Sequence, residues 1–326
     1  MFDLTKDYIE AFHTTLRNPN TIGSNFLLFR KIVNIHILKK KVPIYGSCDV
    51  TNKCNLHCKH CYWWKNYKKE DELSIEEWEE VIENTFIKNK IVNIALTGGE
   101  PLLRPDVIRL FNEMLGNRFV IATNGTLPLR DFGQSAYYVS VDGTENIHNE
   151  IRGQKIYHKV KRNVENYSGK VHVNMTINSL NCDSLETVFE EWKDIVNLIN
   201  FQFFTPFSND DPLWVPFGKK RDEIINRIIK LKDKYPNKFS NTTNQLEVLA
   251  RNDWVKNCPN WAFLPINHRG EIKRPCFIGG ENKPICEKCG MCEVSGVYSA
   301  FDCKDREWFE VNKRLILAEK KSGNPP

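Results

Sequence analysis

Three thiols lie at C-x₃-C-x₂-C spacing in the segment Cys54-Asn55-Leu56-His57-Cys58-Lys59-His60-Cys61. An iron–sulfur cube of the [4Fe–4S] type takes four thiolates when the protein supplies every ligand. Three thiols on one short loop therefore predict a cluster with one iron left open to a small chelating molecule. Structural zinc is the alternative, because it also binds closely spaced cysteines, and His57 or His60 could then be its fourth ligand.

Four short segments downstream combine glycine with polar side chains. They are Thr97-Gly98-Gly99-Glu100-Pro101, Ala122-Thr123-Asn124-Gly125, Ser140-Val141-Asp142-Gly143 and, after His148, Ile151-Arg152-Gly153. Taken singly, the first three are ordinary turns that glycine or asparagine favours, and Arg152 is a solvated helix residue. Their positions along the chain are more informative than the segments themselves, because the first three each follow a short apolar run that is typical of a strand.

The elements that position these residues are predicted by periodicity. The expected strands are 43–50, 91–97, 119–123, 136–141, 170–177 and 200–205, and the expected helices are 74–89, 105–115, 157–167, 183–198, 219–235 and 306–321. Ser74 followed by Glu77 predicts a capping box. Strands that alternate with helices predict a parallel sheet with right-handed crossovers. Six such units fit an open (β/α)₆ barrel, with functional groups at the carboxyl ends of its strands.

The cysteine spacing and the strand-end segments together resemble the radical SAM superfamily over residues 44–303. The resemblance implies a partial TIM-like barrel in which Cys54, Cys58 and Cys61 hold a [4Fe–4S] cluster. The open iron of that cluster would bind the amino and carboxylate groups of S-adenosylmethionine. Electron transfer would then give methionine and a 5′-deoxyadenosyl radical, which removes a hydrogen atom from a C–H bond or adds to an alkene. The protein would position the reactants and exclude water.

The resemblance also implies contacts to S-adenosylmethionine. Gly98, Gly99 and Glu100 would line its methionine half, with Glu100 accepting from the ammonium group. Thr123 and Asn124 would lie near the same cofactor.

Four further residues have implied roles at the same cofactor. Ser140 and Asp142 would contact the ribose, and Arg152 would pair with the carboxylate, which suits a guanidinium. His60 stands where the family usually has an aromatic residue that stacks on adenine. It departs from that pattern by adding a titratable ring.

A second group of cysteines follows residue 240: Cys258, Cys276, Cys286, Cys289, Cys292 and Cys303. Cys258 and Cys276 flank a hairpin around Gly270, which resembles the start of a Twitch or SPASM domain. Both Cys286/Cys289 and Cys289/Cys292 have the C-x₂-C spacing that would complete four ligands. We predict one auxiliary [4Fe–4S] cluster from this group, with a zinc ribbon as the alternative.

Cysteine content, net charge and the length of the apolar runs narrow the classes of protein to which this chain could belong. Nine of the eleven cysteines fall in the two groups, and no secretion signal precedes them, so ligation in a reducing cytoplasm explains them better than disulfides do. The net charge of +5 does not favour a nucleic-acid partner. No apolar run approaches the roughly 20 residues of a membrane span. The amphipathic stretch 26–38 leaves peripheral membrane contact open, although a helix packed on the barrel is the simpler interpretation.

Four regions are expected: an N-terminal helical extension (1–43), the barrel (44–240), an auxiliary-cluster domain (241–305), and a C-terminal helix and tail (306–326). Aromatic residues after the sixth strand would line an apolar entrance: Phe203, Phe204, Phe207, Trp214 and Phe217. They predict a small substrate that is partly apolar or lipid-linked. Cys182 lies near the same entrance, where a thiol could donate a hydrogen atom to a substrate radical.

Two other functions remain open at this point. The first is a peptide-modifying (RiPP-type) maturase with a separate leader-binding partner, because residues 1–43 are too few for a leader-binding domain. The second is a non-catalytic binding protein stapled by zinc. A radical SAM enzyme would need a reducing partner such as flavodoxin or ferredoxin, whether it acts on a small molecule or on a peptide.

Overall fold

The computed structural model describes residues 22–66, 71–251, 253–280, 282–302, 305–308 and 310–311. Its centre is a seven-stranded sheet in the order β6-β5-β4-β3-β2-β1-β7, and all six neighbouring pairs are parallel. The strands are β1 (Tyr45–Asp49), β2 (Asn93–Thr97), β3 (Phe119–Thr123), β4 (Ala136–Ser140), β5 (Val171–Ile177), β6 (Leu198–Phe203) and β7 (Phe263–Ile266). The predicted parallel α/β fold is therefore confirmed.

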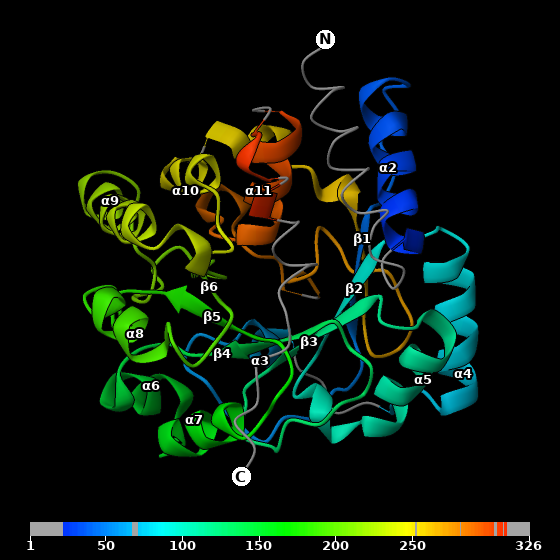
Figure 1. Cartoon of the computed structure of the whole chain (residues 1–326), viewed down its shortest axis with the longest axis horizontal. Coiled ribbons are helices and arrows are strands. Elements are labelled where there is room, and N and C mark those ends of the chain that lie inside the picture. The colour runs from blue at the N-terminus through cyan, green and yellow to red at the C-terminus, as the bar shows by residue number, and fades with distance from the viewer. Residues whose placement is uncertain are drawn as a thin grey trace.

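Helices follow around the outside of the curved sheet (Figure 1). They are α2 (Ile22–His36), α3 (Tyr62–Asn66), α4 (Ile75–Val81), α5 (Pro105–Leu115), α6 (Glu145–Arg152), α7 (Tyr157–Glu165), α8 (Leu185–Trp192), α9 (Lys219–Lys234), α10 (Thr243–Ala250) and α11 (Cys292–Phe301). The Ser74/Glu77 capping box forms at the start of α4. Most of the expected helix 306–321 lies outside the described residues.

Three elements differ from their predicted form. The helix expected at 74–89 is α4 followed by a π-helix, Ile82–Ile87. The helix expected at 183–198 ends at Trp192, and Leu198 already belongs to β6. β6 begins two residues before the predicted strand 200–205, and all six of its residues are buried, the polar Asn200 and Gln202 included. Helix α6 was absent from the prediction because it is short and polar.

The seventh strand corrects the expected count of six. β7 comes from the cysteine-rich region, and it pairs in parallel with β1. Lys273, which follows the β7 hairpin, forms a buried ion pair with Asp49 at the end of β1, with Nζ 2.6 Å from Oδ2. Residues beyond 240 thus complete one edge of the sheet, a contact that local periodicity cannot reveal.

The two faces of the sheet differ in polarity. The face under the helices is a continuous apolar core that includes Phe111, Phe119 and Ile121, each 0% exposed. On the inner face, alternate residues of β2, β4 and β5 are only half-buried. Those near the strand ends are polar: Thr97, Ser140, Asn174 and Thr176. The inner face is therefore the partly open, hydrogen-bonding side of the sheet.

Helix α2 lies against the sheet edge rather than apart from it. Leu27, Leu28 and Ile35 pack on a small core around Ile44. Lys31 Nζ donates to the carbonyl oxygens of Pro43 and Asn89 at 2.7 and 2.8 Å. Among the residues that the structure describes, no helix has both the length and the apolar character needed to cross a bilayer.

His172 on β5 gives the fold a predictable pH dependence. The side chain is 1% exposed, and neither ring nitrogen has a hydrogen-bond partner among the described residues. Burial lowers the pKa of His172 to about 3. Below pH ~6.5 the unfolded chain therefore binds a proton that the folded chain does not, and the free energy of unfolding falls.

We expect the His172 side chain alone to lower the free energy of unfolding by about 2 kcal/mol between pH 7 and pH 5. Urea unfolding at both pH values should therefore show a smaller loss in His172→Asn than in the parent chain. His158→Asn is the matched control, because its side chain is 74% exposed. An unchanged pH dependence in His172→Asn would contradict the prediction.

Candidate functional site

The thiol loop begins where β1 ends, and the Gly-Gly-Glu turn after β2 lies directly against it. Gly99 N–H donates to the Thr51 carbonyl at 3.0 Å, and Glu100 N–H donates to the Lys53 carbonyl at 2.8 Å. A Cβ on Gly99 would stand 2.0 Å from the Lys53 carbonyl oxygen, and Gly98 has a φ of +119°. The two glycines are therefore required by the close approach of two backbones.

Glu100 is buried, with 1% exposure, and it fastens the ends of β2 and β3 together. Its Oε1 accepts from Thr123 Oγ1 at 2.7 Å and from Leu102 N–H at 3.1 Å, and its Oε2 accepts from Asn124 N–H at 2.8 Å. Burial raises the pKa of this carboxyl above its usual value, although these hydrogen bonds oppose the shift. Glu100 and Thr123 are therefore hydrogen-bonded to each other in this structure.

Asn124 connects the third strand to the thiol loop. Its Nδ2 donates to Asn55 Oδ1 at 2.9 Å, and Asn55 Nδ2 donates to Thr126 Oγ1 at 2.8 Å. Thr126 closes the network by donating from both N–H and Oγ1 to Asn124 Oδ1. Asn55, the residue after the first cysteine, was not predicted as a site residue, and its neighbours in sequence gave no signal for it.

Asp142 and Arg152 form a buried ion pair beside the second thiol. Arg152 Nε donates to Asp142 Oδ2 at 2.7 Å, and Arg152 Nη1 lies 3.7 Å from Cys58 Sγ. Burial is the largest single effect and opposes the charge on Asp142, but Arg152, His60, His148 and a hydrogen bond from Thr176 N–H together hold the pKa of the carboxyl below its usual value. His60 Nε2 lies 3.6 Å from the same carboxylate, and burial lowers the pKa of His60 to about 4. Ser140 ends β4, in register with Asn174.

Helix α6 and Trp64 hold the rest of the loop. Lys59 N–H donates to the Ile151 carbonyl at 2.8 Å. Trp64 stacks on His57 with ring centroids 4.0 Å apart, and its Nε1 donates to the Leu56 carbonyl at 3.1 Å. The segment that precedes Gly153 is thus a support for the thiol loop.

The three thiols Cys54, Cys58 and Cys61 share one electrostatic environment. Burial raises the pKa of Cys54 to about 11 and that of Cys61 to about 12, and the neighbouring thiols add to both shifts. Iron would deprotonate them, as metals do for bound thiols. The described residues contain no group of three or more His, Cys, Asp or Glu side chains placed to hold one metal ion.

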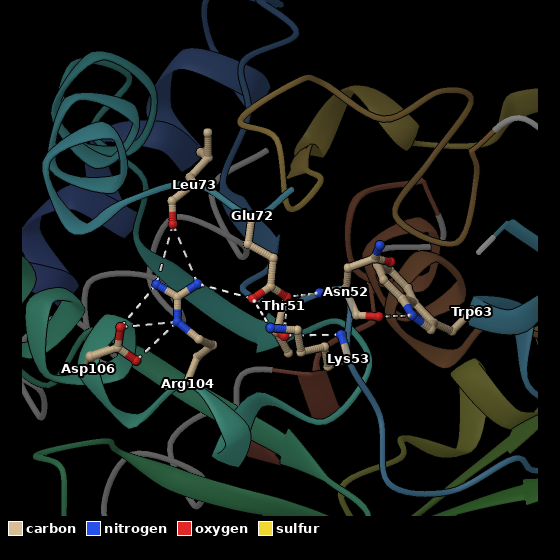
Figure 2. A network of polar contacts seen from close by, with 8 residues as sticks. All are labelled: Thr51, Asn52, Lys53, Trp63, Glu72, Leu73, Arg104 and Asp106. Atoms are coloured by element: carbon tan, nitrogen blue, oxygen red, sulfur yellow. Dashed lines mark hydrogen bonds and ion pairs between the residues drawn. The ribbon is translucent and has the colours of Figure 1, made fainter. Parts of the chain in front are cut away.

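Glu72 holds the entry to the loop through a network of polar contacts (Figure 2). Its Oε1 accepts from Thr51 Oγ1 at 2.5 Å and from Asn52 N–H at 2.6 Å, while Oε2 lies 3.5 Å from Lys53 Nζ. Arg104 Nη1 lies 3.4 Å from the same oxygen, and Arg104 also binds Asp106. Burial opposes the charge of Glu72, yet these contacts hold its pKa below the usual value. Sequence patterns gave no signal for this residue.

We expect Glu72→Gln to destabilise the chain by about 1–3 kcal/mol, because hydrogen bonds to a charged acceptor are lost or weakened. Urea unfolding at pH 7 measures this loss. The exposed Glu79 on α4 is the matched control, and Glu79→Gln should stay within about 0.5 kcal/mol of the parent. Equal stabilities of the two variants would show that Glu72 does not hold the loop.

The model of the radical SAM superfamily matches residues 49–199, which include the thiol loop and all the strand-end segments. The chain carries a radical SAM domain. The predicted resemblance to the radical SAM superfamily is confirmed over these residues, and the expected [4Fe–4S] cluster and S-adenosylmethionine are the cofactors of that family.

Two curated relatives share this domain. Fe-coproporphyrin III synthase of Methanosarcina barkeri is 32% identical over 188 residues, which are 53% of this chain and 45% of that protein. The sporulation killing factor maturation protein SkfB of Bacillus subtilis is 31% identical over 171 residues, 47% of this chain and 40% of SkfB. The chain thus covers less than half the length of either relative.

A solved structure shows the same fold over a longer stretch. SuiB of Streptococcus suis bound to the precursor peptide SuiA has a TM-score of 0.59 and 12% identity, covering 85% of this chain and 70% of SuiB. This likeness supports the partial TIM-like barrel beyond the residues that the family model matches.

The second group of cysteines in this radical SAM chain divides in space. Cys258, Cys276 and Cys289 border one small apolar cluster around Trp254 and Met291. The charges of Cys258, Cys276 and Cys286 each help to raise the pKa of Cys289 to about 12, after the larger effect of burial.

Cys292, which also belongs to the predicted ligand group, has other partners. It begins α11, and its Sγ accepts from Asn200 Nδ2 at 3.0 Å. Cys182 is also remote from solvent, with 0% exposure in the main core, so it does not stand at an open entrance. Cys303 lies outside the described residues.

Proposed function

We propose that this chain reductively cleaves S-adenosylmethionine and uses the resulting radical to remove a hydrogen atom from a peptide or another amide-bearing substrate. One observation carries the first half: Cys54, Cys58 and Cys61 lie on a single loop that every strand-end segment of the radical SAM domain supports. When bound, the cluster passes one electron to the sulfonium of S-adenosylmethionine and so supplies the adenosyl radical. A flavodoxin or ferredoxin type of reductant would deliver that electron.

The chain's own residues set the conditions for this chemistry. The three thiolates bind iron and leave one iron open. Arg152 places a positive charge 3.7 Å from Cys58 Sγ, which favours the thiolate form. The Asp142 carboxylate and His60 lie on the same side, where they would meet the adenosyl half of the cofactor. Trp64 shields the loop from water through its stack on His57.

The substrate class follows from the inner face of the sheet. Asn174 lines that face, and the buried Asn200 and Gln202 lie behind it, with Asn200 Nδ2 2.6 Å from Asn174 Oδ1 and Gln202 Nε2 3.0 Å from Thr176 Oγ1. Asn174 and Thr176 are half-buried and thus reachable. Paired amide donors and acceptors suit the backbone of a peptide. The peptide-modifying alternative therefore gains support.

Two of the aromatic residues that suggested an apolar substrate are buried, whereas Phe207, Trp214 and Phe217 are half-buried. Phe203 and Phe204 are 1% and 5% exposed, and Phe203 belongs to the main core. Trp214 and Phe217 pack edge to face with centroids 6.0 Å apart. Because these rings are used in packing, they no longer favour a lipid-linked substrate.

The test uses the full chain, reconstituted with iron and sulfide without oxygen and assayed with dithionite and S-adenosylmethionine. We expect formation of 5′-deoxyadenosine, and a further increase when a pool of short synthetic peptides is added. An increase with an isoprenoid alcohol and none with peptides would overturn the substrate class. A preparation that binds zinc, binds no iron and forms no 5′-deoxyadenosine would overturn the enzyme itself.

A further inference from the structure

Arg221 is a charged side chain without a partner in the interior of the protein. It lies near the start of α9 and is 0% exposed. Its Nε, Nη1 and Nη2 atoms have no hydrogen-bond partner among the described residues. The guanidinium carbon sits between two aromatic rings, 4.1 Å from the centroid of Phe203 and 4.2 Å from that of Phe217. These rings satisfy the faces of the guanidinium but leave its five N–H donors unused.

A buried cation of this kind is costly unless an anion accompanies it. Arginine does not escape the cost by losing its proton in the neutral range. Burial lowers the pKa of Arg221 to about 9, and the charge of Cys289 opposes that shift. Cys289, a thiol of the second cysteine group, is thus close enough for its ionised form to act on the guanidinium.

Backbone contacts fix this proximity. Phe203 N–H donates to the Gly290 carbonyl at 2.9 Å, and Gly290 N–H donates to Thr205 Oγ1 at 2.9 Å. A Cβ on Gly290 would stand 2.4 Å from the Phe203 carbonyl oxygen, so the two segments can approach only because residue 290 is glycine. The residue after Cys289 therefore lies against the same phenylalanine whose ring covers Arg221.

We propose that Arg221 is the buried counter-charge of an auxiliary [4Fe–4S] cluster held by Cys258, Cys276, Cys286 and Cys289. This inference goes beyond the proposed function and rests on the predicted auxiliary cluster, in which these four thiols are the ligands. Four thiolates make the ligated cluster a net anion, so it supplies the negative charge that Arg221 lacks. A fixed cation stabilises the more negative, reduced form of such a cluster and raises its reduction potential.

The experiment isolates the auxiliary cluster in the full chain by replacing Cys54, Cys58 and Cys61 with alanine. In that background we expect about four irons per chain. A redox titration followed by electron paramagnetic resonance then gives the potential. Arg221→Gln should shift it by at least a tenfold change in the reduction equilibrium, 59 mV toward more negative values. Arg221→Lys keeps the charge and should stay near the parent.

Arg227→Gln is the matched control, because it removes an arginine of the same helix that pairs with Glu186 at the surface. Its potential should equal that of the parent. An unchanged potential in Arg221→Gln with four irons bound would overturn the proposal.

If Arg221→Gln binds no iron, the Arg221→Lys variant decides between a charge role and a packing role for this residue. Recovery of the cluster by lysine supports a charge role, whereas loss in both variants with normal folding by circular dichroism assigns Arg221 to packing. If the triple-alanine chain binds no iron while the parent still forms 5′-deoxyadenosine, the auxiliary cluster is refuted and the radical SAM function stands.

Discussion

Replacing Cys58 by alanine is expected to reduce 5′-deoxyadenosine formation by at least about 10³-fold, the scale of losing an essential group. Two thiols cannot hold a cube that already lacks its fourth protein ligand. Iron should fall by about half, from roughly eight to roughly four atoms per chain, because the auxiliary site is separate. Product quantification by mass spectrometry and iron analysis of the same anaerobic preparation measure both effects.

Cys182→Ala is the control for this prediction, because Cys182 is equally a free cysteine but lies in the apolar core at 0% exposure. It should keep its iron and its cleavage activity, with at most a moderate loss of stability. Continued cleavage in Cys58→Ala would refute the assigned ligand set. Loss of all iron in Cys58→Ala would instead mean that the second cysteine group holds no independent cluster.

The second large effect is expected at the buried ion pair between Asp142 and Arg152. Arg152→Met should lower the free energy of unfolding at pH 7 by about 3–5 kcal/mol, because Asp142 is 0% exposed and would keep an uncompensated charge. Asp142 has a depressed folded pKa, so its contribution is fully present above the unfolded value of about 3.9 and disappears as pH falls through the folded value. Urea unfolding at pH 7 measures the loss.

Arg162→Met on the exposed side of α7 is the matched control and should stay within about 0.5 kcal/mol of the parent. Adding Asp142→Asn to Arg152→Met should recover part of the loss, since both charges are then absent, and the two changes should be non-additive. A loss below about 1 kcal/mol in Arg152→Met would show that the pair is not a buried ion pair in solution.

Tertiary structure changed the interpretation of Glu100. The resemblance assigned its carboxylate to the ammonium group of S-adenosylmethionine. In the structure, three donors from Leu102, Thr123 and Asn124 already occupy it. We therefore propose that Glu100 chiefly positions the turn against the thiol loop, and that the backbone of the glycine turn faces the cofactor.

The sequence by itself determined the reactive loop and most of the sheet. Cysteine spacing and the ends of apolar runs are local properties, so Cys54, Cys58 and Cys61 and the segments at 97–101, 122–125 and 140–143 were identifiable in one dimension. Strand 119–123 and helix 105–115 matched to the residue, because each has a clear period and a clear terminus. Resemblance added the cofactor, which no composition could have supplied.

Only the tertiary structure decided which distant segments meet. β7 joins β1 across more than 200 residues, and the polarity of its short strand gave no sign of that pairing. The contacts of Glu72 and the isolation of Arg221 between two rings have the same origin. Each depends on the packing of segments far apart in the chain, where burial and the presence of a counter-charge are set by neighbours that sequence periodicity does not encode.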